Sequence, residues 1–538
     1  MSIQEFSGFL ESHLEKVEPL SREVNLAYWA ATISGKSEDF KKSARLQVEL
    51  QRIYSDRSDF ESIRGWRNER SGFDDTEQRQ IELLHNAYLR NQVDPALNER
   101  ITRLQSKIEN NFNVYRATIN GKPATSNDIL RILKNSTDSA LRMEAWKAGK
   151  AVGDIVRDDL LTLVRFRNDA AESLGYSNYY SMSMALSEQD EEEIVTLFDE
   201  LEKLTRQPFA SLKEEIDRRT AARFGIEVSS IRPWHYEDPF FQEAPRIYDV
   251  ELDQYYADRN ILAVVREFFN GIGLQVDEIV ARSDLYEKPG KDQHAFCTDI
   301  DRSGDIRILT NLKNDEMWTG TLLHELGHAV HDLYINARLP YLLRQEAHIF
   351  TTEAIAMLFG RLSKDPEWIG EIAGLSDEEK NRIAEESGRI LRLQQLVFAR
   401  WSQVMLRFER ELYRDPAQDL NALWWDLAAK YQMLAPPDEI DCPHWAAKTH
   451  IVSAPVYYHN YLLGELLASQ LNHYIGDRIL PPDKSNSLHG QMGVGDYLKT
   501  EFFSVGARYR WDELVKKSTG EDLTPKYFVE EFVTSRVR

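Results

Sequence analysis

Apolar residues recur at three- and four-residue steps through the first 230 or so residues, for example from Phe6 to Val17. This spacing is typical of helices that bury one face. A further helix is predicted to begin at Gln189–Glu193, because acidic residues in a first turn complement the helix dipole. Breaks between helices are predicted at the turn-rich stretches Ser34–Lys36, Ser71–Asp75 and Asn120–Pro123.

The pattern changes after residue 231. The turn Ser303–Asp305 is flanked by the run His294–Asp301 and by the run Ile306–Thr310, which alternates like a strand. This arrangement predicts an antiparallel hairpin. Helical patterns then return over 314–339, 346–362 and 379–413, followed by a turn-rich segment at 476–493 and a last helical stretch. Asn314 is the predicted N-cap of the first of these helices. Strand content should therefore be small and the fold mainly α.

Composition fits a soluble globular protein, with 42% hydrophobic and 29% charged residues among 538. This length predicts one large body or two lobes. We treat 1–538 as a single unit, with a mainly helical N-terminal part (1–230) and a second part (231–538). The net charge of −22 argues against nucleic acid or an anionic membrane as partner.

The same chain predicts a cytoplasmic location. It has two cysteines, Cys297 and Cys442, too few for the disulfide framework of a large secreted protein. Its first residues lack the basic and apolar segments of a signal peptide, and no apolar run is long enough to span a bilayer.

Candidate chemistry lies in the segment His324-Glu325-Leu326-Gly327-His328. Residues four apart share one face of a helix, so His324 and His328 can point both imidazoles at one zinc ion. Glu325 would then lie beside the ion as a general base for a water molecule. Apolar neighbours such as Leu322 and Val330 predict a buried helix, and buried polar side chains need partners. We therefore expect one zinc ion per chain.

A third ligand is expected downstream, and Glu346, His348 and Glu353 are the candidates. Glu353 is preferred because it lies in the mostly apolar run Thr351–Phe359, where an unpaired carboxylate is costly. Further along, Tyr458 and Tyr461 are three residues apart, so one of them can donate a hydrogen bond to an oxyanion. A packed aromatic helix start is the alternative interpretation of this pair. His450 and Lys448 could hold a peptide carbonyl and a C-terminal carboxylate, and the alternative is that both are ordinary surface residues.

Taken together, these blocks resemble the angiotensin-converting enzyme family of zinc peptidyl-dipeptidases, with features of the thimet oligopeptidase and oligoendopeptidase F families. The blocks that carry the resemblance are Ala27–Thr32, Glu287–Pro289 with His294-Ala295, Asp305–Ile308, His324–His328 with Glu353-Ala354-Ile355, and Lys448-x-His450 with Tyr458-x-x-Tyr461. Glu353 follows His328 by 25 residues, close to the family's interval.

The resemblance implies two mostly helical lobes around a deep central channel covered by N-terminal helices, with a small antiparallel sheet beside the zinc helix. It also implies that 1–538 is a single peptidase unit with its catalytic part over 231–538, and it implies roles for named residues. His324, His328 and Glu353 hold zinc, Glu325 is the general base and then acid, and His450 and Tyr461 stabilise the oxyanion. The peptide would be bound by His294 and the Ala295 backbone from the strand, and its C-terminal carboxylate by Gln242, Lys448 and Tyr458.

The chain departs from the converting enzymes at several positions. Met357 replaces an aspartate four residues after the glutamate ligand, and His459-Asn460 replace the chloride-binding arginine, so chloride activation is not expected. The His450–Tyr461 spacing lies between those of the two families. Release of C-terminal dipeptides from short peptides is the predicted activity. The alternatives are internal cleavage by an oligoendopeptidase, or an inactive peptide-binding protein on a peptidase scaffold. No pattern selects an oligomeric state.

Overall fold

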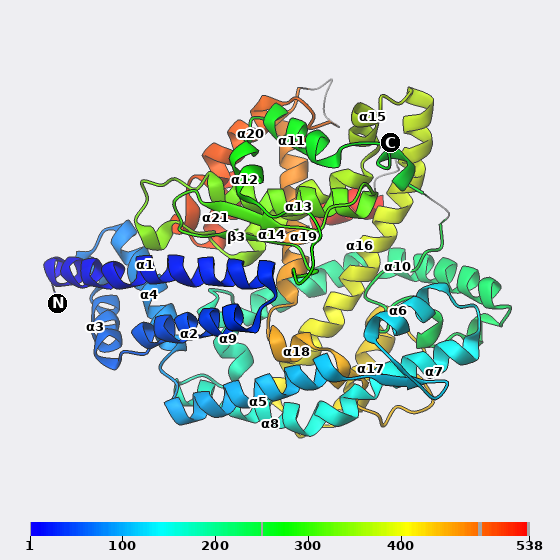
Figure 1. Cartoon of the computed structure of the whole chain (residues 1–538), viewed down its shortest axis with the longest axis horizontal. Helices are drawn as coiled ribbons and strands as arrows, with labels where there is room; N and C mark the ends of the chain where they lie inside the picture. The colour runs from blue at the N-terminus through cyan, green and yellow to red at the C-terminus, as the bar shows by residue number, and fades with distance from the viewer. Residues whose placement is uncertain (1, 249–250, 482–486, 535–538) are drawn as a thin grey trace. The chain divides into compact units, whose positions relative to one another are not determined.

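A computed structural model of the chain describes residues 2–248, 251–481 and 487–534 (Figure 1). It is 71% helical, and the described residues contain two small antiparallel sheets. These proportions confirm the predicted mainly-α fold class. The centre of the predicted turn-rich segment 476–493 lies outside the described residues.

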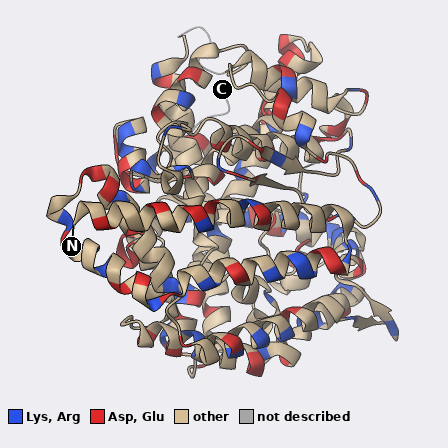
Figure 2. Cartoon of the chain, turned by 60° about the vertical axis from the view of Figure 1, so that its left-hand side comes forward, with Lys and Arg blue, Asp and Glu red and all other residues tan. Residues whose placement is uncertain are grey.

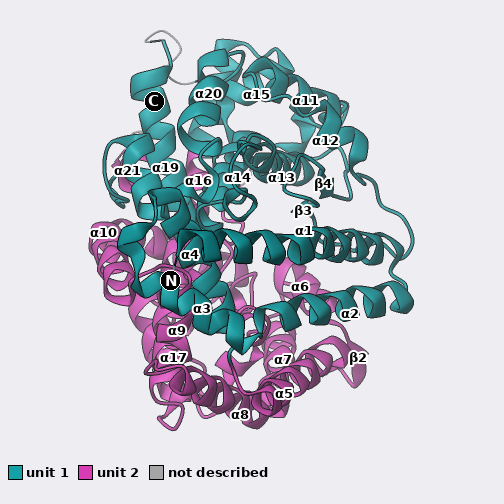
Figure 3. Ribbon diagram, turned by 90° about the vertical axis from the view of Figure 1, so that its left-hand side faces the viewer, with its two compact units in different colours: residues 1–92, 250–387, 463–528 teal, residues 93–249, 388–462, 529–538 magenta. Residues whose placement is uncertain are grey.

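The chain divides into two compact units, each assembled from three separate segments (Figure 3). Unit 1 comprises residues 1–92, 250–387 and 463–528, and unit 2 comprises residues 93–249, 388–462 and 529–538. Each unit therefore contains residues from both sides of position 230. That 1–538 acts as a single peptidase unit stays a prediction.

Unit 1 holds the first four helices and the helices around the metal-site motif. They are α1 (Ile3–Ser34), α2 (Ser37–Tyr54), α3 (Arg57–Asn68), α4 (Asp75–Arg90), α11 (Ile261–Gly271), α12 (Asp277–Arg282), α13 (Glu316–Leu333), α14 (Ile349–Gly360), α15 (Pro366–Ala373), α20 (Met492–Tyr497) and α21 (Trp511–Thr519). Its core lies around α13 and α14, where Leu322, Leu326 and Ile355 are fully buried. Because α14 is apolar on all sides, packing must surround it.

Unit 2 is built from longer helices. They are α5 (Pro95–Val114), α6 (Ser126–Asn135), α7 (Ser139–Lys150), α8 (Val152–Ser173), α9 (Tyr179–Leu186), α10 (Glu191–Phe224), α17 (Leu420–Leu427) and α18 (His450–Ser453). Three helices contain a unit boundary in the chain: α16 (Asp377–Arg414), α19 (His459–Tyr474) and α22 (Lys526–Val529). In unit 2 the core includes Val156 and Leu160 of α8 and Trp401 of α16, all fully buried.

Acidic N-caps start many of these helices. Side-chain oxygens of Asp56, Asp74, Asp138, Asp190 and Asp365 accept backbone N–H groups from the first turns of their helices. Such caps satisfy donors that have no partner inside the helix. The predicted break at Ser34–Lys36 is confirmed, since α1 ends at Ser34 and Gly35 follows in the left-handed region at φ 64°.

Two hairpins make up the described sheets. Strands β3 (Phe296–Asp299) and β4 (Ile306–Leu309) pair antiparallel, with Phe296 opposite Leu309, and both pack against α13. This confirms the hairpin predicted just before the helix that contains His324 and His328. The other hairpin, β1 (Ala117–Ile119) with β2 (Lys122–Ala124), lies inside the stretch predicted to be nearly all helix. Its strands have three residues each, too short to show an alternating pattern.

Several predicted helix boundaries are wrong; for example, the helix predicted over 314–339 ends at Leu333. The N-cap of α13 is Asp315 rather than Asn314, because the Asp315 carboxylate accepts the Trp318 N–H at 2.7 Å. The helix predicted over 346–362 begins later, at Ile349, because the preceding residues form a bend and His348 caps the helix.

Charged residues of both signs are scattered along the helices (Figure 2). Many acids lie in first helical turns, for example Glu191–Glu193 of α10. Among the described residues, no helix combines the length and the apolar character that crossing a membrane requires.

Candidate metal centre and substrate-binding residues

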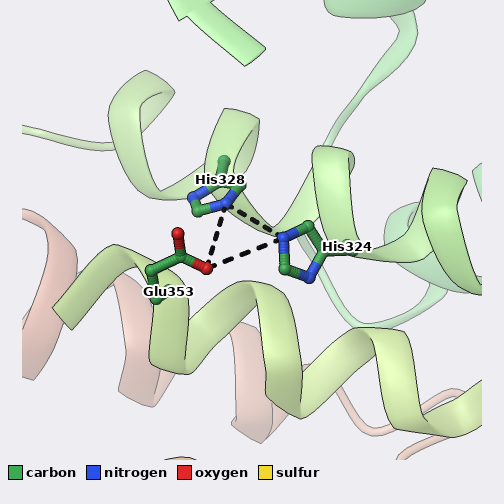
Figure 4. A group of neighbouring side chains, drawn as sticks. All are labelled: His324, His328 and Glu353. Carbon is green, nitrogen blue, oxygen red and sulfur yellow. Dashed lines mark hydrogen bonds and ion pairs between the residues drawn. The ribbon is translucent and has the colours of Figure 1, made fainter. Parts of the chain in front are cut away.

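Three side chains of unit 1 converge on one point (Figure 4). His324 and His328 project from α13, and Glu353 projects toward them from α14. The two Nε2 atoms are 3.2 Å apart, and each lies 3.8 Å from Glu353 Oε2. The side chain of His324 is 31% exposed and that of Glu353 10%, so the cluster is open to solvent along His324.

Close contact between α13 and α14 sets this geometry. Gly327 lies against α14, where a Cβ at this position would come within 2.7 Å of Ala356 Cα. Gly360 of α14 lies against His324, whose Cβ would be 3.4 Å from an added methyl group. Glycine at position 327 lets the helices approach until a carboxylate on α14 reaches imidazoles on α13. A glycine within a helix costs about 1 kcal/mol relative to alanine, and this close approach is the reason for one at position 327.

The donor set fits a metal ion such as zinc. Zinc–ligand bonds of about 2.0–2.1 Å in a tetrahedron place ligand atoms roughly 3.3–3.4 Å apart, close to the observed 3.2–3.8 Å. Nδ1 of His328 lies 2.8 Å from Thr352 Oγ1, so its N–H can donate to that hydroxyl and leave the Nε2 lone pair facing the cluster. Three protein ligands leave a position open for water or substrate.

Burial keeps the two imidazoles in the neutral form that ligates metals. It lowers the pKa of His324 to about 4, against a smaller opposing effect of the Glu465 charge. Burial also lowers the pKa of His328 well below its ordinary value, helped by His324 and His331. Metal ligation requires unprotonated nitrogen, so both side chains are ready to bind at neutral pH.

Glu325 has a strongly perturbed carboxyl group. It is 7% exposed, and burial, followed by the charge of Glu353, raises its pKa to about 8. A carboxyl whose pKa lies near neutrality can both accept and return a proton. This is the property that a general base next to a metal site needs.

The other two candidates for the third ligand lie elsewhere in unit 1. Nδ1 of His348 accepts the Phe350 N–H at 3.2 Å and caps α14. Glu346 lies in the bend before α14, half-buried, and is not among the three side chains of the cluster. Of the three candidates, Glu353 is the one that the fold brings to the histidines.

His294 and Ala295 do not lie on the strand that was predicted to carry them. Both lie in the bend just before β3, which begins at Phe296, and His294 is exposed. The His294 N–H donates to Asp292 Oδ1 at 2.9 Å, so a local turn replaces strand pairing there. Ala295 keeps a backbone position next to the strand, and its role in peptide binding stays a prediction.

The five remaining predicted site residues gather in unit 2. The Lys448 ammonium donates to Gln242 Oε1, and its Nζ lies 5.2 Å from the Tyr458 ring centroid. The Tyr458 ring in turn lies 5.2 Å from the His450 ring and 5.4 Å from the Tyr461 ring. Gln242 and Lys448 are more than 200 positions apart in the sequence. The fold brings them into one polar cluster with both tyrosines.

Burial affects the protonation of this cluster. It lowers the pKa of Lys448 to about 8, with the charges of Asp238 and Glu243 acting in the opposite direction. It also lowers the pKa of His450 to about 4, with a further contribution from Lys448. His450 is therefore neutral at pH 7 and can donate from one ring nitrogen.

Sequence reasoning missed three supporting residues, Thr352, Arg361 and Glu465. Thr352 orients His328, and Arg361 of α14 pairs with the buried Glu465 of α19 next to the metal cluster. Met357, which replaces the family's aspartate, packs against Gly464 instead. The motif spacing gave no signal for the ion pair, because its two members are 104 residues apart.

Two models of known protein families match different parts of the chain. Residues 2–225 match the family model described as angiotensin-converting enzyme, and residues 276–534 match the model of peptidase family M3. The second match includes His324, Glu325, His328 and Glu353.

Several curated proteins are similar over most of the chain. Rat angiotensin-converting enzyme is 24% identical over 96% of this chain and 41% of its own length. Mouse angiotensin-converting enzyme-like protein Ace3 is 23% identical over 80% of the chain and 62% of its own length. Thermostable carboxypeptidase 1 of Pyrococcus furiosus is 22% identical over 73% of the chain and 77% of its own length. The chain thus spans less than two thirds of the first two relatives.

Proposed function

Because the chain is related to the angiotensin-converting enzymes and shares features with peptidase family M3, we propose that it is a zinc metallopeptidase that hydrolyses short peptides. The observation that carries the proposal is the convergence of His324, His328 and Glu353 next to the buried Glu325. This arrangement combines a metal-binding donor set with a carboxyl group able to move a proton.

His324, His328 and Glu353 would hold the ion. Zinc bound there supplies Lewis-acid chemistry and lowers the pKa of water and of the adjacent Glu325 carboxyl. Thr352 fixes the His328 ring by accepting its Nδ1–H, which keeps the ligating nitrogen in place.

Glu325 performs the proton transfers in this mechanism. As a carboxylate it accepts a proton from the attacking water, and it then returns that proton to the amine that leaves. Its buried position excludes bulk water that would otherwise compete for the proton. We assign oxyanion stabilisation to Tyr461 and His450, whose O–H and N–H groups can donate to a developing negative charge.

We further propose that the enzyme releases C-terminal dipeptides. The support is the cluster of Gln242, Lys448 and Tyr458 in unit 2, where a partly desolvated ammonium faces polar groups that can bind a free carboxylate. That this cluster and the metal centre act on one peptide is part of the proposal. Internal cleavage is the second candidate, favoured by the match of residues 276–534 to peptidase family M3.

The substitution Glu325→Gln tests the catalytic assignment. We expect the variant to bind one zinc per chain, as wild type does, and to lose at least about 10²-fold in kcat, because the general base is gone while the ligands remain. Glu371→Gln, at an exposed position on α15, is the control and should leave both values unchanged. Undiminished hydrolysis by the Glu325→Gln protein would remove Glu325 from the mechanism.

Cleavage mode is tested with one peptide carrying either a free or an amidated C-terminus. Mass spectrometry of the products should show dipeptides from the free form and little cleavage of the amide. Equal cleavage of both forms would favour the oligoendopeptidase. A zinc-loaded protein that binds the free peptide and cleaves neither form would instead be a peptide-binding protein on this scaffold.

A further inference from the structure

Unit 2 contains a second buried ammonium group that the proposed mechanism does not use. Lys150 is the last residue of α7 and is 5% exposed. Among the described residues its Nζ has no hydrogen bond or ion pair, and instead it lies 3.0 Å from the ring centroid of Phe240 and 5.5 Å from that of Trp146. Burying a charged amine without a partner is costly. Lys150 therefore calls for an explanation beyond packing.

Lys448 lies in the same group of aromatic side chains. We call this group, formed by Phe240, Trp146 and Trp401, the aromatic pocket. Its Nζ is 5.2 Å from the Phe240 centroid and 5.1 Å from that of Trp401. Both ammonium groups thus lie near one ring, although like charges at short range repel in a buried site. Burial lowers the pKa of Lys150 well below its ordinary value, Asp238 opposes this effect, and the charge of Lys448 adds to it.

The pocket holds less negative than positive charge. The acidic groups that act on the two lysines are Asp238, which is buried, and Glu243, which is exposed and lies 3.4 Å from Lys134. Asp238 already accepts the backbone N–H groups of Phe240 and Gln242. One buried carboxylate thus lies near two buried amines. One of the amines therefore has no counter-charge among the described residues, and a second anion could supply it.

The backbone around the pocket is held in a strained conformation. Phe241 has φ 52°, a left-handed value that is rare for a residue with a bulky side chain. Side chains fix it from two sides: Trp146 Nε1 donates to Pro239 O at 2.9 Å, and Gln432 Nε2 donates to Phe241 O at 2.9 Å. Such strain persists where the surroundings enforce it, and it is concentrated at ligand sites.

We propose that Lys150 is a specificity-determining residue that acts with Lys448 on the free C-terminal carboxylate of a peptide. This inference rests on the proposed function and adds a second cation to the carboxylate pocket. When both amines are protonated and Asp238 is ionised, the pocket has a net positive charge that an entering carboxylate neutralises. A peptide amide cannot neutralise that charge and is rejected.

The test compares Lys150→Met with wild type on an alanine pentapeptide and its C-terminal amide. Methionine removes the charge and keeps an unbranched side chain that is one atom shorter than that of lysine. We expect kcat/KM for the free acid to fall about tenfold or more, mostly through KM, and kcat/KM for the amide to stay within about twofold. Lys150→Arg, which keeps the charge, should retain the preference for the free acid.

Lys147→Met is the matched control. It lies on the same helix, is 37% exposed and pairs with Glu439 at 2.9 Å on the surface. It should leave both kcat/KM values unchanged. An equal loss on acid and amide in Lys150→Met would show a structural role for Lys150, and an unchanged preference would show no role. Either result overturns the inference.

Binding without hydrolysis separates this inference from the proposed function. In the Glu325→Gln background, calorimetry should show tighter binding of the free acid than of the amide, and Lys150→Met should reduce this difference by about tenfold or more, with Lys448 keeping the remainder. This result supports the inference even if the wild-type protein cleaves neither peptide, in which case the proposed function alone fails. An undiminished preference in the double variant overturns the inference whatever the activity.

Discussion

His331 lies one turn beyond His328 on α13, with its ring 5.1 Å from that of Phe503 and 5.7 Å from that of Phe502. Its side chain is buried, and Nδ1 has no hydrogen-bond partner in the described part of the chain. Burial lowers the pKa of His331 to about 3, from an ordinary value of 6.5. The folded state therefore keeps this imidazole neutral.

This shift predicts a dependence of stability on pH. Between pH 6.5 and about 3 the unfolded chain binds a proton at His331 that the folded protein does not bind. The contribution of a neutral His331 to stability is thus complete above pH 6.5 and is lost as pH falls toward 3. The slope from one such group is at most about 1.4 kcal/mol per pH unit.

Replacing His331 with leucine should remove this slope. We expect His331→Leu to gain stability over wild type as the pH is lowered from 7 to 5, because leucine binds no proton in either state. Urea unfolding of both proteins at each pH, with a chelator present, measures the difference. His473→Leu, at an exposed position, is the control and should show no such trend. A constant difference between His331→Leu and wild type would contradict the assignment.

For single residues, the sequence predicts the chemistry of a side chain where that chemistry follows from local spacing. His324 and His328 share a helix face, and the apolar neighbours of Glu353 favoured it over His348 as the carboxylate near them. Thr352 and Lys150 could not be predicted in the same way. Their partners, His328 and Phe240, are brought to them by the tertiary fold.

Contact between α13 and α14 gives the metal centre its shape. An alanine at Gly327 would place its Cβ 2.7 Å from Ala356 Cα and 3.1 Å from Ile355 O, both of them backbone atoms. Backbone cannot move aside as a flexible side chain does, so the helices must separate. Separation moves Glu353 away from His324 and His328.

Gly327→Ala should therefore lower both stability and zinc affinity. We expect a loss of about 1–3 kcal/mol in the free energy of unfolding, typical of an overpacked core. Gly8→Ala is the control, because Gly8 lies in α1 and a Cβ there meets no atom within 4 Å. It should be neutral or stabilising by up to about 1 kcal/mol, as helix propensity predicts. Thermal unfolding and chelator competition measure the two effects, and equal behaviour of both variants would refute this account of the helix contact.

Elements with a strong local signal were predicted well, and their ends were not. The apolar pattern located α13 and α14, and the turn Ser303–Asp305 located the β3–β4 hairpin. The start of α14 depends on His348, which caps the helix with a ring nitrogen, an uncommon capping group. The bend that takes His294 and Ala295 out of the strand depends on Asp292, whose carboxylate accepts the His294 N–H.

The division of the molecule into units could not be predicted, since it depends on contacts between distant segments. In unit 1, Asn25 Nδ2 donates to Asp299 O at 3.0 Å, and Arg79 Nε donates to Ala507 O at 2.9 Å. Trp29 packs with Ile300 and Leu309 of the hairpin that borders α13. The first 92 residues are therefore part of the same compact unit as the candidate metal centre.

A fragment that begins at residue 93 should for this reason fail to form unit 1. Without α1–α4, the fragment exposes apolar surface around Ile300 and Leu309 and leaves the buried Ala507 carbonyl without its Arg79 donor. We expect residues 93–538 alone to bind a hydrophobic dye and to take up zinc poorly. Co-expression with residues 1–92 as a separate chain should restore zinc binding, because the missing contacts are non-covalent. If the fragment alone matched the full chain in melting temperature and zinc content, the metal centre would not need the first four helices.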